Sequence, residues 1–205
     1  MILARACAPV SLPAVETVRP SLLAGPAADV VDVVVLRLDR AATPPQRRAE
    51  AGRLLRQVLA GYLGAAPGEI EVVRGPHGKP ELADRAVRFN LSHSNDLAVV
   101  AVTRDRAVGV DVERTDARRD VAALAPRALG ADEAEMVLAL PSSEQRDAFH
   151  RAWARREAVA KCAGTGLAAP PPDAPRQVVD LDVGPGYAAA LAVEGAAPVR
   201  VELRA

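Results

Sequence analysis

The sequence VGVDVE at residues 108–113 and the sequence WARREAVAK at residues 153–161 decide the fold of this chain. The first is rich in β-branched residues and is typical of a strand, in which side chains two positions apart leave the same face. Asp111 and Glu113 are therefore expected on one face. In the second, Trp153, Glu157 and Lys161 are spaced four apart, which places them along one stripe of a helix. A strand and a helix arranged in this way can bring three carboxylates together.

Three carboxylates that converge on one point suit a magnesium ion. Asp111, Glu113 and Glu157 supply hard oxygen ligands, and Mg²⁺ usually keeps some waters and completes its octahedron with substrate phosphates. The simpler interpretations are that Glu157 and Lys161 form an ordinary i,i+4 surface pair and that the strand carboxylates mark a solvated face. The residues upstream favour a Mg²⁺-dependent phosphoryl-transfer site over these interpretations.

The composition is that of a globular chain without a bias toward a charged partner. Its 205 residues suffice for one large domain or two small ones with a real core. Only 2% of the residues are aromatic although 50% are hydrophobic, so the core must consist of Ala, Val and Leu. Because 26 basic and 26 acidic residues cancel, charge gives no argument for a nucleic-acid or membrane partner, and phosphate recognition must be local.

The cysteines and the N-terminal residues indicate a cytoplasmic protein. Cys7 and Cys162 lie far apart and show neither metal-binding nor disulfide spacing, as expected in a reducing compartment. Residues 1–20 lack a sustained apolar segment, so no signal peptide is predicted, and no stretch approaches a membrane span.

The predicted elements repeat in two halves. Residues 1–28 form a Pro- and Ala-rich lead-in, and turns are predicted at 75–80 and 92–96. The first half has a strand at 30–38, a helix at 44–63 and strands at 69–73, 87–91 and 97–103. The second has a strand at 107–113, a charged connector at 114–126, helices at 132–140 and 143–163, and strands at 177–183, 187–193 and 199–203. This pattern predicts an α+β pseudo-dimer of two similar halves, residues 1–105 and 106–205, each a small antiparallel sheet with packed helices. Ligands favour the junction of such halves.

Groups suited to phosphate also occur upstream of the two deciding segments. Lys79, Ser92 and His93 supply a cation, a hydroxyl and an imidazole at adjacent strand ends, and such groups grip a phosphate. A histidine in a turn is nevertheless more often a solvent-facing residue than a ligand. Arg47 and Arg48 lie on the predicted first helix, where a solvated face is the simpler interpretation for most of the arginines.

Four motifs occur in an order that resembles a known family. They are Gly78-Lys79-Pro80, Phe89-Asn90-Leu91-Ser92-His93-Ser94, Gly109-Val110-Asp111-Val112-Glu113 and Trp153-x-x-Arg156-Glu157-x-x-x-Lys161. The set resembles that of the 4′-phosphopantetheinyl transferases, specifically the larger, Sfp-like type that activates surfactin synthetase, over roughly residues 30–193. The resemblance implies a single chain of two similar halves that acts as a monomer, unlike the short acyl-carrier-protein synthases, which trimerise.

The resemblance implies a reaction and its participants. Mg²⁺-bound coenzyme A would donate its 4′-phosphopantetheine arm to a serine hydroxyl of an apo acyl or peptidyl carrier protein and release adenosine 3′,5′-bisphosphate. Whether the carrier belongs to fatty-acid, polyketide or nonribosomal-peptide synthesis stays open. Neither nucleic acid nor a membrane is expected as a partner.

The resemblance also implies roles for individual residues. Asp111, Glu113 and Glu157 look like the metal ligands, and Lys161 looks like the cation beside the phosphoryl group. Contacts with coenzyme A are implied for Ser92, His93, Arg156, Lys79 (on the adenine side or at a phosphate) and, at the 3′-phosphate, Arg48 with Arg47 as the alternate. Asp111, Glu157 and Lys161 are the catalytic candidates, and either Glu157 or a metal-bound water that it orients would accept the serine proton. The family usually has lysine at the position of Arg156, so the role of that residue stays open.

Two other functions use the same residues. A non-catalytic module could bind coenzyme A or another nucleotide without transfer, which Arg156 and the few basic residues before the first helix favour. A metal-dependent pyrophosphate hydrolase needs the same carboxylates. For a transferase, docking on an acidic carrier helix favours basic residues such as Arg118, Arg119 or Arg127, although an exposed arginine is usually only solubilising.

Overall fold

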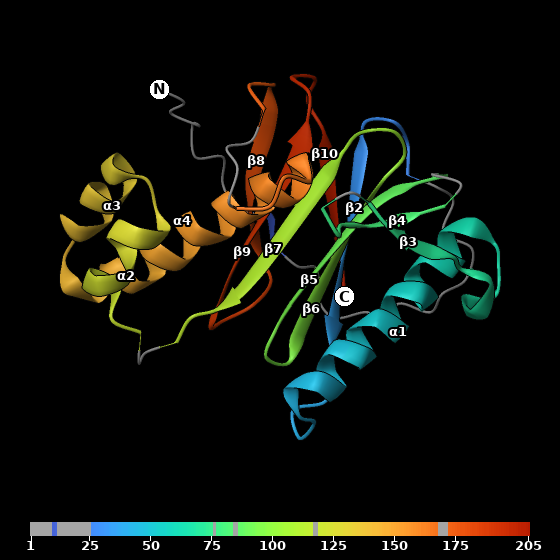
Figure 1. Ribbon diagram of the computed structural model, residues 1–205, viewed down its shortest axis with the longest axis horizontal. Helices are drawn as coiled ribbons and strands as arrows, with labels where there is room; N and C mark the ends of the chain where they lie inside the picture. The colour runs from blue at the N-terminus through green and yellow to red at the C-terminus, as the bar shows by residue number, and fades with distance from the viewer. Residues whose placement is uncertain (1–9, 12–25, 76, 84–85, 117–118, 168–171) are drawn as a thin grey trace.

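In the computed structural model, two four-stranded sheets pack face to face and a long helix covers the outer face of each (Figure 1). The structure describes residues 10–11, 26–75, 77–83, 86–116, 119–167 and 172–205. No helix in these residues is both long and apolar enough to cross a membrane.

The strands form two mixed sheets and a short ribbon. The first sheet has the order β10 (Arg200–Arg204), β2 (Val30–Arg37), β6 (Leu97–Thr103) and β5 (Arg88–Ser94). The second has the order β1 (Val10–Ser11), β8 (Arg176–Asp182), β9 (Tyr187–Glu194) and β7 (Val108–Arg114). The ribbon pairs β3 (Val72–Arg74) with β4 (Pro80–Leu82).

Both sheets repeat one topology. In the first, β2 pairs antiparallel with β6 and β6 with β5, and in the second β7 pairs with β9 and β9 with β8 in the same way. Helix α1 (Pro44–Leu63) follows β2, and helix α4 (Ser142–Ala163) precedes β8. The predicted α+β class, with small sheets and packed helices, is confirmed.

The fourth strand of each sheet comes from the other end of the chain. β10 lies parallel to β2, and β1 lies parallel to β8. The first sheet therefore contains a strand from the predicted C-terminal half, and the second contains one from the N-terminal half. The boundary at residues 105 and 106 stays a prediction.

One hydrophobic core lies between the two sheets. Side chains alternate along each strand, so every second residue of the valine-rich strands points inward. The core residues include Val31, Val33, Val35, Leu97, Val99, Val108, Val110, Val112, Leu191 and Val193. The buried members of this core are Val, Leu and Ala, as the scarcity of aromatic residues predicts.

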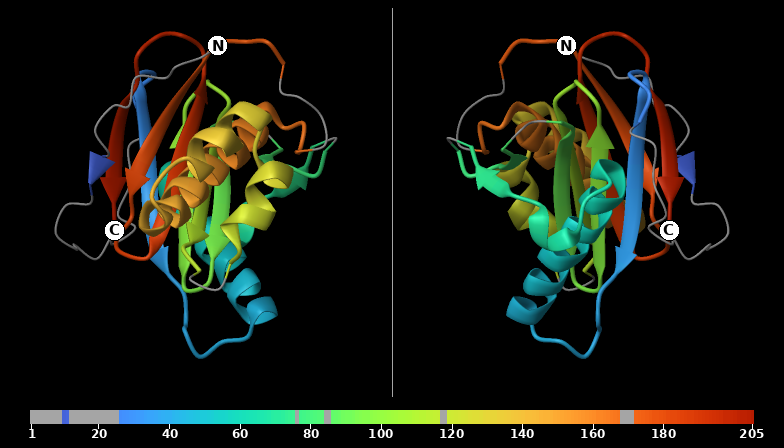
Figure 2. Two further views of the ribbon diagram at one scale, coloured as in Figure 1. Left: turned by 90° about the vertical axis from the view of Figure 1, so that its left-hand side faces the viewer. Right: turned by 90° about the vertical axis from the view of Figure 1, so that its right-hand side faces the viewer.

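The helices cover the outer faces of the sheets. α1 places Leu55 and Leu59 on Val100 of the first sheet, whereas α4 places small residues such as Ala158 on Ala190 of the second sheet. Two short helices, α2 (Val121–Ala128) and α3 (Ala131–Leu138), pack against α4 at the end of the molecule away from α1 (Figures 1 and 2).

Two predictions for polar segments were wrong. The predicted connector at 114–126 contains the first turns of α2, which begins where the Asp120 carboxylate accepts a hydrogen bond from the amide of Ala123. The predicted turn at 92–96 is shorter, because β5 continues to Ser94 and only Asn95 and Asp96 turn the chain. Asn95 adopts a φ of 53°, in the left-handed region that asparagine tolerates better than most residues.

Two further segments contain structure that the sequence did not predict. Val10 and Ser11 form β1 within the predicted lead-in, of which residues 1–9 and 12–25 lie outside the described part of the chain. The predicted turn at 75–80 ends in the first residue of β4, and the expected strand start at Glu69 is instead a single 3₁₀ turn, η1 (Pro67–Glu69).

Candidate functional site

Gly109 allows α4 to lie directly on β7. A β-carbon at this position would lie 2.1 Å from the carbonyl oxygen of Ala158 and 2.2 Å from the amide nitrogen of Cys162. Such distances are far below van der Waals contact, so only glycine permits this approach. The contact determines which side chains of α4 reach Asp111, two residues further along the strand.

The side chains of β7 divide between two faces, as the alternation predicts. The valines of the strand point into the core between the sheets, and Asp111 and Glu113 point toward α4. On the helix, Trp153 donates its indole N–H to Glu113 Oε1 at 3.3 Å. Lys161, two turns further along, places its Nζ 2.5 Å from Asp111 Oδ1.

Asp111, Lys161 and Ser92 form a buried polar cluster at the junction of the two sheets. Asp111 is 3% exposed, and its Oδ1 also accepts a hydrogen bond from Ser92 Oγ at 2.8 Å. Lys161 Nζ in turn donates to Ser92 Oγ at 3.1 Å. The other carboxylate oxygen, Asp111 Oδ2, is buried and has no hydrogen-bond partner among the described residues. Because a buried unpaired oxygen is costly, the site is suited to a further donor or a cation there.

Side chains of β5 join the two sheets beside this cluster. Three backbone N–H groups of β7 donate to them: Val110 to Asn90 Oδ1 at 2.9 Å, Val112 to Ser92 Oγ at 3.3 Å, and Arg114 to Ser94 Oγ at 3.0 Å. Alternate side chains of β5 thus replace the backbone ladder that joins paired strands. Ser92 therefore belongs to a strand rather than to the predicted turn, and this strand carries its hydroxyl to Asp111.

Glu113 and Glu157 are acids whose charge is disfavoured at this site. Burial raises the pKa of Glu113 and the negative charge of Asp111 raises it further, although Arg119, with a nitrogen 4.0 Å from Glu113 Oε2, opposes these effects. Burial also raises the pKa of Glu157, where Lys161 opposes the shift and Asp111 adds to it. Burial is therefore the main reason that the charged forms of Glu113 and Glu157 are disfavoured, and the charge of Asp111 adds to it.

This donor set fits a hard divalent cation in its chemistry. A cation near Asp111 Oδ2 would satisfy that oxygen and would favour the charged forms of Glu113 and Glu157, which burial disfavours. In the described part of the chain, no three Asp, Glu, His or Cys side chains already lie close enough together to hold a metal ion. The cation that Asp111 contacts is the ammonium group of Lys161.

His93 lies between two sources of positive charge. Loss of hydration lowers the pKa of its imidazole, and Arg48, Lys161 and Arg47 lower it further. The ring is therefore neutral at pH 7 and can donate one hydrogen bond. The structure thus brings the basic N-terminal turn of α1 and the Lys161 side of α4 to the same histidine.

Comparison with known proteins identifies the part of the chain that carries these carboxylates. Residues 107–200 match the family model of the 4′-phosphopantetheinyl transferase superfamily. Over these residues the chain is similar to that superfamily. The predicted resemblance is confirmed.

Individual relatives carry the same name. The chain is 40% identical over 128 residues to 4′-phosphopantetheinyl transferase HetI of Nostoc sp. (strain PCC 7120), a match that covers 60% of this chain and 54% of that protein. It is 34% identical to the L-aminoadipate-semialdehyde dehydrogenase-phosphopantetheinyl transferase of Xenopus laevis, over 61% of this chain and 46% of that protein. It is 33% identical to 4′-phosphopantetheinyl transferase psf-1 of Bacillus pumilus, over 59% of this chain and 52% of that protein. The chain spans about half the length of these curated relatives.

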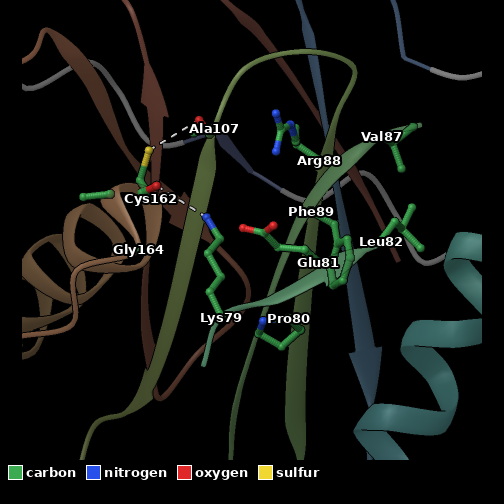
Figure 3. A pocket seen from close by; sticks show the side chains of 11 residues that line it. Lys79, Pro80, Glu81, Leu82, Val87, Arg88, Phe89, Ala107, Cys162 and Gly164 are labelled. Atoms are coloured by element: carbon green, nitrogen blue, oxygen red, sulfur yellow. Dashed lines mark hydrogen bonds between the residues drawn. The ribbon is translucent and has the colours of Figure 1, made fainter. Parts of the chain in front are cut away.

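Lys79 lies outside the matched residues 107–200, beside a pocket between the β3–β4 ribbon and the end of α4 (Figure 3). Its Nζ donates to the carbonyl oxygens of Val108 at 2.9 Å and of Cys162 at 3.4 Å, and burial lowers its pKa. The pocket has a volume of about 160 Å³, and Arg88 and Phe89 also line it. Lys79 therefore ties β7 to α4, and its contact with coenzyme A stays a prediction.

The side chain of Arg156 lies beside Gly130 and Glu133 at the start of α3 rather than beside those of Glu113 or Glu157. It is exposed, and its Nη1 would lie 3.7 Å from a β-carbon at Gly130, at the start of α3. Its charge opposes the effect of burial, which raises the pKa of Glu133 in the first turn of α3. The preceding residue, Arg155, binds Asp180 of β8 at 2.5 Å. A contact between Arg156 and coenzyme A stays a prediction.

The arginines expected to dock a carrier are dispersed. Arg127 is exposed on α2, and Arg119 is half-exposed and lies beside Glu113. Arg118 lies outside the described residues. Of these residues, Arg119 therefore lies beside the candidate site, and a contact of the arginines with a carrier stays a prediction.

Proposed function

We propose that the protein transfers the 4′-phosphopantetheine arm of coenzyme A to a serine of an apo carrier protein. The observation that carries this proposal is the cluster of Asp111, Lys161 and Ser92, in which one oxygen of Asp111 has no partner among the described residues, in a chain whose residues 107–200 match the superfamily model. A pyrophosphate together with a cation provides the charges that such a site would need.

Asp111, Glu113 and Glu157 would hold a magnesium ion. Bound there, the ion would offset the charge of the pyrophosphate and of the leaving adenosine 3′,5′-bisphosphate. The carboxylates suit this role because they are hard oxygen donors, and burial disfavours the charged forms of Glu113 and Glu157 when no cation is bound. Oxygen-rich phosphate substrates and Mg²⁺ are commonly bound together in this way.

The basic groups around the cluster would orient coenzyme A. Lys161 lies within reach of Asp111 and Ser92 but is still 29% exposed, so its ammonium group can bind a phosphoryl oxygen that approaches from solvent. Neutral His93 can donate a hydrogen bond to a phosphate, and Arg48 can add charge from α1. Phosphoryl transfer depends mainly on such positioning and charge stabilisation.

Glu157 is our candidate for the acceptor of the serine proton. Burial raises its pKa, which makes it a stronger base than an exposed glutamate, and if Glu157 binds the ion, a metal-bound water that it orients would accept the proton instead. It lies on the same stripe of α4 as Lys161, four residues earlier. A carrier serine that enters beside Lys161 would therefore meet a base and a cation from the same helix face.

The decisive experiment is a carrier modification assay. The protein is incubated with coenzyme A, Mg²⁺ and a panel of apo carriers from fatty-acid, polyketide and nonribosomal-peptide synthases, and each carrier is weighed by mass spectrometry. We expect the mass of at least one carrier to increase by one phosphopantetheine arm. The Asp111→Ala variant should abolish this transfer while it keeps the circular dichroism spectrum of the parent.

Two other outcomes would replace this proposal with a different function. Mg²⁺-dependent binding of coenzyme A without modification of any carrier would indicate a non-catalytic binding module. Release of adenosine 3′,5′-bisphosphate from coenzyme A in the absence of a carrier would indicate a pyrophosphate hydrolase. For the transferase we further expect a cytoplasmic location and a monomer. Size-exclusion chromatography with light scattering tests the oligomeric state.

A further inference from the structure

A buried carboxylate outside the candidate metal ligands lies in the turn between β5 and β6. Asp96 is 1% exposed although it belongs to a two-residue turn. Its Oδ2 lies 2.5 Å from Arg40 Nε, and its Oδ1 accepts hydrogen bonds from the Tyr187 hydroxyl at 2.5 Å and the Asn95 amide at 2.7 Å. An Arg114 nitrogen lies 3.8 Å from the same oxygen. The hydrogen bond from Tyr187, followed by that from Arg40, holds the pKa of Asp96 well below its usual range.

Asp96 anchors the loop that leads into α1. Its backbone carbonyl accepts a hydrogen bond from the amide of Leu38 at 2.9 Å, and its carboxylate binds Arg40. The first turn of α1 is tied to the same loop, because Arg47 Nη1 donates to the carbonyl oxygen of Arg40 at 3.3 Å. The hairpin that carries His93 therefore also determines where the basic end of α1 lies.

The same carboxylate contacts the second sheet. Tyr187 is the first residue of β9, and Arg114 is the last residue of β7, directly after Glu113. The Arg114 guanidinium lies 6.0 Å from the centre of the Tyr187 ring, within the range of a cation–π contact. One charged group thus links the loop before α1, the hairpin of His93 and the strand of the carboxylates.

We propose that Asp96 is a positioning residue for coenzyme A, which fixes the basic end of α1 opposite His93 and the carboxylate strand. The identity of the ligand rests on the proposed function, whereas the placement of α1 does not. An ion pair between two exposed groups would contribute little to this placement. Here the carboxylate is buried and cannot be hydrated, so its partners are required to stay in contact with it.

The test is the Asp96→Asn variant, which keeps the size of the side chain and removes its charge. With Arg40 released, the arginines of α1 should move away from His93, and the pKa of His93, followed by NMR, should rise toward its ordinary value. The chain has three histidines, so substitution of His77 and His150 assigns the signals. We expect the KM for coenzyme A to rise about tenfold, the scale of one lost charged hydrogen bond. The KM for the carrier and kcat should change little.

A second variant covers the case in which Asp96→Asn does not fold. In Arg40→Met the altered side chain is 81% exposed, so the fold should persist, and the pKa of His93 and the affinity for coenzyme A should shift in the same directions. Arg53→Met is the matched control: it removes one positive charge from α1 at a side chain that binds only Glu50 and Gln57 among the described residues. We expect neither quantity to shift in this control.

The outcomes separate this proposal from the proposed function. Unchanged His93 pKa and unchanged coenzyme A affinity in folded Asp96→Asn and Arg40→Met would overturn it. A lower kcat, equal rises in the KM for coenzyme A and for the carrier, and a lower Tm would also overturn it, because together they indicate a merely structural role. If the parent protein shows no transfer at all, the proposed function fails, and calorimetric titration with coenzyme A together with the His93 pKa still decides the role of Asp96.

Discussion

Lysine is rare in this chain, and both lysines place their ammonium groups against strand β7. Of the 26 basic residues, two are lysines, Lys79 and Lys161. The first binds backbone carbonyls and the second binds Asp111. A compact ammonium fits such a confined place better than the planar guanidinium of arginine. In the structure Lys161 therefore binds Oδ1 of the carboxylate whose other oxygen, Oδ2, is suited to a divalent cation.

We predict from this contact that Lys161 competes with Mg²⁺ for Asp111. The Lys161→Met variant should bind Mg²⁺ more tightly than the parent in a calorimetric titration without coenzyme A, by on the order of tenfold, because removal of a partly buried partner leaves Asp111 uncompensated. The variant should nevertheless lose transfer activity. Arg151→Met, which removes an exposed charge from the same helix, is the control. Equal or weaker Mg²⁺ binding by Lys161→Met would disprove the competition.

Glu113 should make the metal-free protein less stable at neutral pH. Its pKa is higher in the folded than in the unfolded state. The stability that protonation of Glu113 provides is therefore fully present at a pH below the pKa of the unfolded state, and it is lost as the pH rises through the pKa of the folded state. Glutamine mimics the protonated form. Glu113→Gln should therefore raise Tm by a few degrees at pH 7, the scale of ~1 kcal/mol in a chain of this size. The gain should vanish in acid, as scanning calorimetry can show. A gain equal at all pH values, or a similar gain in exposed Glu135→Gln, would contradict this explanation.

At the scale of elements, the contact of α4 with β7 depends on Gly109. Gly109→Ala would place a methyl group 2.1 Å from a backbone oxygen of the helix, so α4 must move and its packing is lost. We expect a loss of roughly 3 kcal/mol or more in urea unfolding, at the severe end for overpacking. Gly52→Ala in α1 is a matched control, since nothing lies within 4 Å of its β-carbon. That variant should be more stable by about 0.5–1 kcal/mol. Similar stabilities for both variants would show that the close approach is not needed.

The sequence predicts the long elements better than the short polar ones, for physical reasons. α1 has the predicted bounds because its signals are local: Pro44 at its first position and Gly64 in the left-handed conformation after its end. The polar end of β5 was predicted as a turn because residues 92–96 form a polar run between two apolar strands. Ser92 and Ser94 instead accept hydrogen bonds from the backbone of a neighbouring strand. Such a partner is distant in sequence, and no local pattern reveals it.

The same distinction holds for the candidate site. Strand and helix periods correctly predict which faces of β7 and α4 carry Asp111 and Lys161, because each period is a property of one segment. Asp96 was not singled out, because the contacts that bury it come from Arg40 and Tyr187, which are 56 and 91 residues away. Only the assembled fold brings these partners to one turn.

At the scale of the molecule, the exchange of terminal strands makes the halves interdependent. β10 adds Arg204 to the first sheet, where it binds the buried carboxylate of Asp32 at 2.9 Å beside the hydroxyl of Tyr62. The core between the sheets also contains residues of both halves, such as Val33 and Leu191. Neither half can bury its apolar sheet face, or compensate all of its charges, without the other.

We therefore predict that the fragments 1–105 and 106–205 do not fold separately. Each alone would expose the valine-rich face that the other covers, a loss of burial that a fragment of this size cannot offset. Urea titrations followed by circular dichroism should show no cooperative transition for either fragment. An equimolar mixture should regain one, together with the thermal shift that coenzyme A and Mg²⁺ give the intact chain. A fragment 106–205 that unfolds cooperatively by itself, as a monomer or as a self-associated form, would show that the carboxylate half is an independent domain and that the first sheet only adds to it.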